Sequence, residues 1–328
     1  MHKRKLGKTG INVSEIGLGC WQLGGDFGPL ADDRAGAILE AAAASGITFW
    51  DTADVYGGGM SEQRIGDFTH KPDGLIVATK VGRDASLYPD GYSLDGVRAS
   101  LAASAQRLGV KTLDLAQLHC VPPAVLQQGD IFSWMETLKA EGLIHHWGAS
   151  VETIDEANLC LQQPGLATLQ IIFNIFRQDA AEALLNRAAE NNVGIIVRLP
   201  LASGLLSGKF SADTRFDSSD HRNYNRDGAA FSVGETFGGI PFAKGVELVE
   251  NLRRILGVQQ GDSDMASLAL RWILDHPAVS TVIVGASSPQ QVAGNAAASE
   301  RPALDSALHK QLAEFYRGEV RSHIRGDI

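Results

Sequence analysis

Cysteine is scarce in this sequence, which contains three among 328 residues, namely Cys20, Cys120 and Cys160. The number is odd and no two of them form a CxxC pair, so the pattern indicates no disulfide framework. Proteins without disulfides are typical of reducing compartments. We therefore expect a protein of the cytoplasm.

Long apolar stretches and an excess of basic residues are also absent. No uninterrupted run reaches the roughly 18 apolar residues that a membrane span needs, and residues 1–10 lack the apolar core of a signal peptide. The chain has 29 Lys and Arg against 38 Asp and Glu, which gives a net charge of −9. This balance argues against a general nucleic-acid binder. We expect neither membrane nor nucleic acid as a partner.

The sequence lacks the glycine motifs of the common nucleotide-binding sheets. Residues 17–24 follow the first predicted strand but do not fit G-x-G-x-x-G, and residues 204–209 fail the P-loop pattern. These mismatches count against the open doubly wound sheet, which is the alternative to the fold predicted below.

What the sequence does contain is a regular alternation of apolar runs with helical patterns. Strand-like runs are predicted at 14–19, 47–50, 74–80, 113–118, 144–149, 166–173, 194–197 and 281–284. Helices are predicted at 32–44, 61–69, 93–108, 131–141, 153–161, 180–191, 242–256, 263–275, 289–298 and 304–320. Eight such units predict a closed α/β barrel, the (β/α)8 TIM barrel, in a single domain over residues 1–328. A β-hairpin at 5–16 precedes it, and a long glycine-rich loop at 200–239 follows strand seven.

Four polar side chains stand at the carboxyl ends of neighbouring strands or in the loop after one of them: Asp51, Tyr56, Lys80 and His119. Active sites of such barrels gather at this end. We expect Asp51 to pair with Lys80, and Lys80 to lower the pKa of the Tyr56 phenol. With His119 orienting a carbonyl oxygen, the phenol would donate a proton to it. Because no side chain supplies hydride, this chemistry requires a nicotinamide cofactor.

The chain resembles the aldo-keto reductase family over essentially its whole length. The resemblance is carried by KLGKTGINVSEIGLG, FWDTADVYGGGMSEQRIG, ATKVG, LAQLHC, GLIHHWGAS, LASGLLSGK and VIVGASSPQQVAGN. It is greatest to the branch of bacterial general aldehyde reductases. It implies an NAD(P)H-dependent reductase of small aldehydes or ketones, in which the family's tetrad falls on Asp51, Tyr56, Lys80 and His119 without substitution.

The resemblance also places the cofactor. It implies contacts from Gly19, Cys20, Trp21, Ser150, Gln170, Arg198, Pro200, Leu201, Gly204, Leu206, Lys209, Gly285, Ala286, Ser287, Gln291 and Asn295. Two positions depart from the family's pattern: Val151 stands where many members have Asn, and Arg198 where an aromatic ring commonly stacks on the nicotinamide. We expect Trp21 and Tyr88 to line the substrate pocket.

Three alternatives remain at this stage. The cofactor is expected to be NADP(H), as is usual in the family, although the absence of Lys and Arg from 285–291 keeps NAD(H) as the alternative. A non-catalytic barrel that binds the cofactor as a regulatory subunit is the second function considered. The third is a metal-dependent hydrolase using Asp51, Asp54 and His119; it would leave Tyr56 and Lys80 without a role, and we expect no metal.

Overall fold

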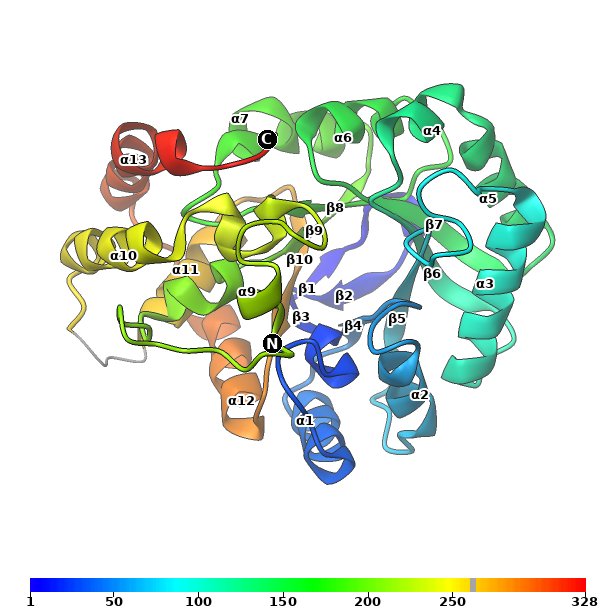
Figure 1. Ribbon diagram of the computed structural model, residues 1–328, viewed down its shortest axis with the longest axis horizontal. Helices are drawn as coiled ribbons and strands as arrows, with labels where there is room; N and C mark the ends of the chain where they lie inside the picture. Colours follow the sequence, from blue (N-terminus) through cyan, green and yellow to red (C-terminus); the bar gives the residue numbers. More distant parts are fainter. Residues whose placement is uncertain (260–263) are drawn as a thin grey trace.

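The computed structural model describes residues 1–259 and 264–328, and its centre is a closed barrel of eight parallel strands (Figure 1). The strands follow one another around the barrel in chain order, and β10 pairs with β3 to close it. They are β3 (Ile16–Gly19), β4 (Phe49–Asp51), β5 (Ile76–Val81), β6 (Leu113–His119), β7 (Ile144–Ser150), β8 (Thr168–Ile172), β9 (Gly194–Arg198) and β10 (Val279–Gly285). The predicted (β/α)8 barrel is confirmed, and the open doubly wound sheet is wrong.

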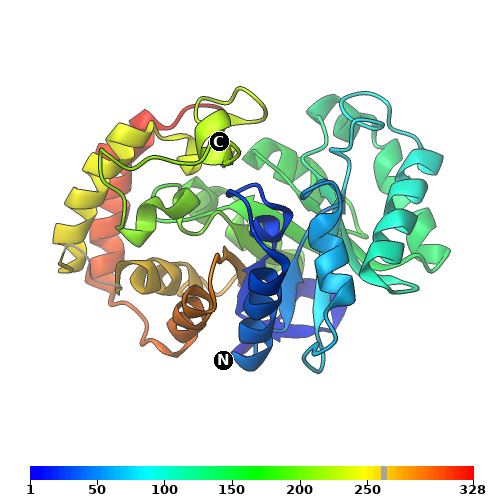
Figure 2. The ribbon, with the colours of Figure 1, turned by 60° about the horizontal axis from the view of Figure 1, so that its bottom comes forward.

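Helices cover the outside of the barrel (Figure 2). They are α1 (Asp32–Ala44), α2 (Met60–Asp67), α3 (Leu94–Leu108), α4 (Pro123–Gln128), α5 (Asp130–Ala140), α6 (Ile154–Leu161), α7 (Asp179–Ala183), α8 (Leu185–Glu190), α10 (Phe242–Leu256), α11 (Asp264–Leu274), α12 (Pro289–Ala297) and α13 (Ser306–Phe315). The short helix α9 (His221–Tyr224) lies over the mouth of the barrel instead (Figure 1). Most begin and end within two residues of their predicted bounds. The helix predicted from residue 263 starts outside the described residues, and its described part is α11.

Three helical predictions needed correction. The helix expected at 180–191 is divided into α7 and α8, because the buried Leu184 adopts φ −132° and ψ −45° between them. The helix expected at 304–320 ends as an α-helix at Phe315 and continues as a π-helical turn over Tyr316–Val320. The six-residue α4 was not predicted, since so short a segment shows no periodicity.

The predicted N-terminal hairpin closes one end of the barrel. It consists of β1 (Lys3–Lys5) and β2 (Asn12–Ser14), paired antiparallel. Leu6 and Val13 are fully buried and pack on side chains that point into the barrel, among them Phe49 and Leu115. Gly7 has φ +54°, and a Cβ there would lie 2.4 Å from the Gly194 nitrogen. With this end filled, the opposite end, where the strands finish, is left for a ligand.

The long segment after β9 lies over that opposite end, around α9 (Figure 1). His221, the first residue of α9, donates its backbone N–H to the Asp26 carbonyl at 3.0 Å, in the loop after β3. Its imidazole is fully buried and lies 4.5 Å from the Trp21 ring and 4.4 Å from the Phe27 ring, centroid to centroid. These contacts join the loops after β9 and β3 across the barrel mouth.

Helix α6 offers a test of the local signals that begin these helices. Thr153 Oγ1 accepts a hydrogen bond from the Glu156 N–H at 3.1 Å, and Glu156 returns one by accepting from the Thr153 N–H. Thr153→Ala should lower the free energy of unfolding by about 1 kcal/mol, as loss of an N-cap usually does. Urea denaturation would measure it, and Thr153→Ser, which keeps the hydroxyl, should retain most of the stability. Equal losses in both variants would contradict the capping role.

Candidate active site

The polar side chains predicted from the strand ends meet at the mouth of the barrel. The Lys80 ammonium donates to Asp51 Oδ1 at 2.5 Å, to the Tyr56 phenol oxygen at 3.0 Å and to the Thr52 carbonyl at 2.8 Å. Asp51 and Lys80 come from the neighbouring strands β4 and β5, whose register sets Asp51 beside Ala78. The His119 ring lies 5.9 Å from the Tyr56 ring at an interplanar angle of 84°. The four residues therefore form one group.

The Asp51 carboxylate is held by amides as well as by the ammonium. Its Oδ2 accepts from Gln117 Nε2 at 3.1 Å and from Gln170 Nε2 at 2.7 Å. Gln170 was predicted as a cofactor contact, and the structure shows its amide nitrogen bonded to Asp51. Gln117 was not predicted, although the sequence carries a signal for it. It precedes His119 by two residues in one strand, which puts both side chains on the same face.

Burial and neighbouring charges together set the pKa values of Lys80 and Tyr56. Burial alone would lower the pKa of the Lys80 ammonium, but attraction by Asp51 and Tyr56 outweighs it, and the pKa lies above its usual value. Burial also raises the pKa of the Tyr56 phenol to about 12, and the opposing effect of Lys80 is smaller. Lys80 lowers this pKa, as expected, but burial makes the net shift upward. At neutral pH the phenol carries its proton.

His119 is neutral at the same pH. It is buried, and burial together with repulsion from Arg83 and Lys80 holds the pKa of its imidazole well below the usual range. Its Nδ1 is buried and has no partner among the described residues. A neutral imidazole in this place can hydrogen-bond a polar ligand without adding charge.

A cavity of about 740 Å³ begins at this group and continues beside the ends of β9 and β10. Its lining includes most of the predicted cofactor contacts: Gly19, Cys20, Trp21, Ser150, Gln170, Arg198, Pro200, Leu201, Gly204, Lys209, Gly285, Ser287, Gln291 and Asn295. Leu206 and Ala286 are buried and lie outside this lining, because their side chains pack into the core. Tyr88 also lies outside it, 48% exposed in the loop after β5.

Aromatic rings form the wall of the cavity beside Tyr56. Trp21 stacks on the Tyr56 ring at 5.8 Å between centroids and contacts Phe27 at 5.2 Å and Phe231 at 6.0 Å. The predicted place of Trp21 at the pocket agrees with this geometry. Phe27, which lines the cavity, was not predicted, because it comes from a loop whose conformation leaves no periodic pattern.

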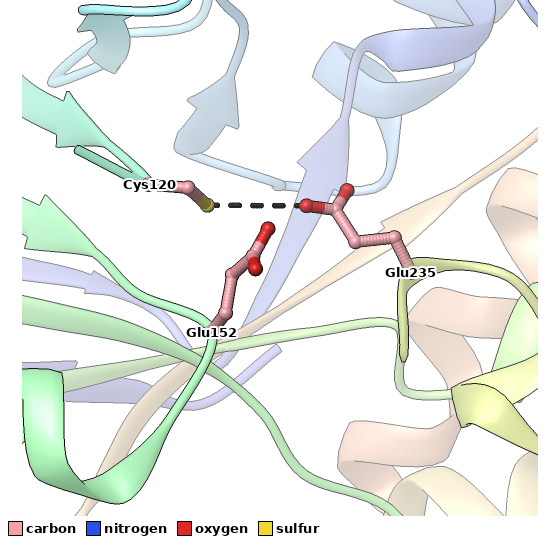
Figure 3. A group of neighbouring side chains, drawn as sticks. All are labelled: Cys120, Glu152 and Glu235. Atoms are coloured by element: carbon pink, nitrogen blue, oxygen red, sulfur yellow. Dashed lines mark hydrogen bonds between the residues drawn. The ribbon is translucent and has the colours of Figure 1, made fainter. Parts of the chain in front are cut away.

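Charged residues gather on the other side of the mouth. Cys120, Glu152 and Glu235 bring one ligand atom each within 4.8 Å of the others (Figure 3). Arg83 donates to Glu152 at 2.5 Å and to Glu235 at 2.8 Å, and Arg198 lies 3.6 Å from Glu235. Two guanidinium groups would repel a metal ion, so these side chains fit an ion-pair network rather than a metal site.

The group proposed for a metal-dependent hydrolase is not assembled in this way either. Asp51 is bonded to Lys80 and two amides, and Asp54 turns to Ser100, whose hydroxyl donates to its carboxylate at 3.0 Å. An ammonium in contact with Asp51 would oppose a cation there. The hydrolase alternative therefore finds no support in this geometry.

Comparison with known proteins agrees with the reductase chemistry. The sequence profile of the Aldo/keto reductase family matches residues 15–317. The chain belongs to this family. Among its relatives, D-threo-aldose 1-dehydrogenase from a Pseudomonas species is 31% identical, over 93% of this chain and 95% of its own. The NADH-specific methylglyoxal reductase of Escherichia coli is 30% identical, over 96% of this chain and 99% of its own.

Solved structures of aldo-keto reductases have the same fold. One from Bacillus halodurans, in its holo form, has 26% identity and a TM-score of 0.75 over 96% of each chain. The reductase reading is thus favoured over the regulatory subunit, and the protein is an NAD(P)H-dependent carbonyl reductase. Assignment to the general aldehyde reductase branch stays a prediction. No helix in the described part of the chain has the length and apolarity to span a bilayer.

The residues of this reductase fit a nicotinamide cofactor. Buried polar atoms that line the cavity have no partner among the described residues: Gln22 Oε1, His119 Nδ1 and Arg198 Nε. Such atoms are costly to leave unbonded and indicate a polar ligand. At the far end of the cavity, Arg34 donates to the Ser287 carbonyl at 2.8 Å, and Ser288 caps helix α12. A helix N-terminus favours phosphate.

Asp54 gives a pH-dependent prediction for the reductase. Burial raises the pKa of its carboxyl to about 6, and Oδ1 is buried without a partner in the described residues. The folded state therefore favours the protonated acid, and this stabilisation is lost as pH rises through 6. Asp54→Asn, which cannot ionise, should gain about 1 kcal/mol relative to wild type between pH 5 and pH 7. Urea denaturation at both pH values would measure this gain. If the difference in free energy of unfolding between Asp54→Asn and wild type is the same at pH 5 and pH 7, the prediction is wrong.

Proposed function

We propose that Tyr56 is the proton donor in the reduction of a small aldehyde or ketone, assisted by Lys80, Asp51 and His119. When bound, the nicotinamide cofactor supplies the hydride that the carbonyl carbon receives. Tyr56 gives its phenolic proton to the carbonyl oxygen as the C=O π bond breaks, so the product is an alcohol. The phenolate then regains a proton from solvent.

The observation that carries this proposal is the hydrogen bonding of the Tyr56 hydroxyl. Its oxygen accepts from Lys80 at 3.0 Å, and its O–H donates to no acceptor in the described part of the chain. The proton is thus left for a ligand in the cavity. Lys80 also lies where the phenolate charge would develop, and it stabilises that charge as the proton leaves. Asp51 holds Lys80, and neutral His119 supports a hydrogen bond to the same carbonyl oxygen.

The cofactor we propose is NADP(H). Ser150 and Gln170 would hold the carboxamide end, because their side chains line the cavity and bond to each other at 3.3 Å. The Ser287 end would hold the adenosine, with α12 and Arg34 available to a 2′-phosphate. NAD(H) is the alternative, since one relative is named as NADH-specific.

We also propose that the protein works in the cytoplasm as one barrel domain over residues 1–328. Its three cysteines are all buried and free, as suits a reducing compartment. The proposed substrate is a small carbonyl compound that enters between Trp21 and Tyr56. Two relatives are named for an aldose and for methylglyoxal, which makes small oxygenated aldehydes the first substrates to try.

Tyr56→Phe tests the proton donor. It should lower kcat by about 100- to 10,000-fold, the usual contribution of a general acid, while the Kd of NADPH changes little. Turnover is followed as NADPH oxidation with small aldehydes, and binding by quenching of tryptophan fluorescence. The matched control is Tyr316→Phe. Tyr316 directly follows α13, away from the cavity, and the change removes only a hydroxyl that is bonded to Asp179. Full activity of Tyr56→Phe would refute the assignment.

Arg34→Gln tests the cofactor assignment. If a 2′-phosphate lies at the Ser287 end, removing this cation should reduce the preference for NADPH over NADH by about tenfold, because one charge-assisted contact is lost. The ratio of kcat/KM for the two cofactors measures it in wild type and variant. Lys310→Gln, an exposed charge on α13, is the control. A wild-type ratio that favours NADH would replace NADP(H) by NAD(H).

A further inference from the structure

Arg198 is a cation at the reacting end of the cavity. It is the last residue of β9, is 7% exposed and lines the cavity with Ser150 and His119. Its Nη2 lies 3.8 Å from the sulfur of Cys120, the residue that follows His119 in the chain. The guanidinium therefore lies close to the group that would hold the carbonyl oxygen.

The guanidinium of Arg198 lies near a carboxylate but has no hydrogen bond to one within residues 1–259 and 264–328. Its Nη2 donates to the Val151 carbonyl at 3.0 Å, which is a neutral acceptor. Its nearest carboxylate is Glu235, with 3.6 Å between Nη1 and Oε2, longer than a good hydrogen bond. Its Nε is buried and has no partner among the described residues. The guanidinium thus makes no short contact with an anion in the described part of the chain.

The other cations at this end are paired more closely. Lys80 lies 2.5 Å from Asp51. Arg83 lies 2.5 Å from Glu152 and 2.8 Å from Glu235, so the carboxylate nearest to Arg198 is already bonded to another guanidinium. Two neighbours of Arg198 carry no charge at neutral pH, because His119 is neutral and burial raises the pKa of the Cys120 thiol to about 11. The buried guanidinium of Arg177 is a further charged neighbour, and it repels Arg198.

A cation beside a nicotinamide ring distinguishes the two oxidation states of that ring. The ring of the oxidised cofactor carries a positive charge, and that of the reduced cofactor does not. Hydride must reach a carbonyl carbon whose oxygen contacts Tyr56 and His119, so the reacting ring lies at this end of the cavity. Repulsion between two cations in a site of low dielectric is strong. It acts on the oxidised form alone.

We propose that Arg198 makes this reductase bind the reduced cofactor more tightly than the oxidised one, with Glu235 limiting the difference. The proposal rests on the proposed function, because it requires the nicotinamide at this end. Its consequence is that the oxidised cofactor leaves readily after each turnover and inhibits weakly. Without Glu235 the same repulsion would oppose the charge that develops on the ring as hydride leaves. Arg198 favours release of the oxidised cofactor, and Glu235 limits the repulsion that would otherwise oppose hydride transfer.

The test compares two dissociation constants on one protein. Titration of the ligand-free enzyme with NADPH and with NADP+, followed by quenching of tryptophan fluorescence, gives the ratio Kd(NADP+)/Kd(NADPH). Arg198→Met should lower this ratio by about tenfold, and Glu235→Gln should raise it by a similar factor, because the changes in charge have opposite signs. Arg198→Lys keeps the charge and should keep most of the ratio. Arg254→Met, an exposed change on α10, is the control for net charge.

The outcomes separate the proposal from the function on which it rests. Each ratio is measured within one folded protein, so a loss of stability alone does not move it, and thermal melting identifies any variant that fails to fold. Opposite shifts in Arg198→Met and Glu235→Gln support the proposal. A ratio unchanged in both overturns it, even where NADPH binds and the wild type turns over. If the wild type binds neither NADPH nor NADH, the proposed function itself is wrong, and the proposal for Arg198 is overturned with it.

Discussion

The structure depends most on one buried ion pair, between Lys80 and Asp51. Lys80 is 1% exposed, and an ammonium withdrawn from water to this degree is stable only where its charge and its three N–H groups are matched. Asp51 supplies the charge, and Thr52 and Tyr56 accept the other two hydrogen bonds. The second oxygen of Asp51 is bonded by Gln117. The Lys80 ammonium and both oxygens of Asp51 therefore all have partners, which come from β4 and the loop after it, from β6 and from β8.

That arrangement couples the fold to the chemistry. A slip of one residue in the register of β4, β5 or β6 would turn these side chains from one face of the strand to the other. It would leave a charge unpaired in the barrel, at a cost of several kcal/mol. The same hydrogen bonds that satisfy Lys80 leave the Tyr56 O–H as the unsatisfied donor. The hydrogen bonds that pair the buried charge of Lys80 thus also leave the Tyr56 proton facing the cavity.

The strands and most of the catalytic group could be predicted from the sequence, whereas properties that depend on burial and loop conformation could not. Strands and the residues that end them follow from period and position, so Asp51, Lys80 and His119 could be placed before any coordinates. The pKa of Tyr56 could not, because it depends on how completely the cavity wall buries the phenol, and burial outweighs the ammonium. Tyr88 shows the same limit: a loop residue next to a strand end can turn to solvent, and no periodic pattern reveals it.

The two positions that depart from the family's pattern, Val151 and Arg198, contact each other in the structure. Arg198 donates a hydrogen bond to the backbone carbonyl of Val151. Because the acceptor is a backbone atom, this contact does not depend on the side chain at position 151. The guanidinium is held from the other side by Glu235, which comes from the long loop after β9 and also bonds Arg83. Glu235 is the carboxylate nearest to this cation, at 3.6 Å, so it offsets part of the cost of burying the charge of Arg198. Through Glu235, the loop that lies over the barrel mouth is linked to Arg198, the residue that we propose discriminates between the two forms of the cofactor.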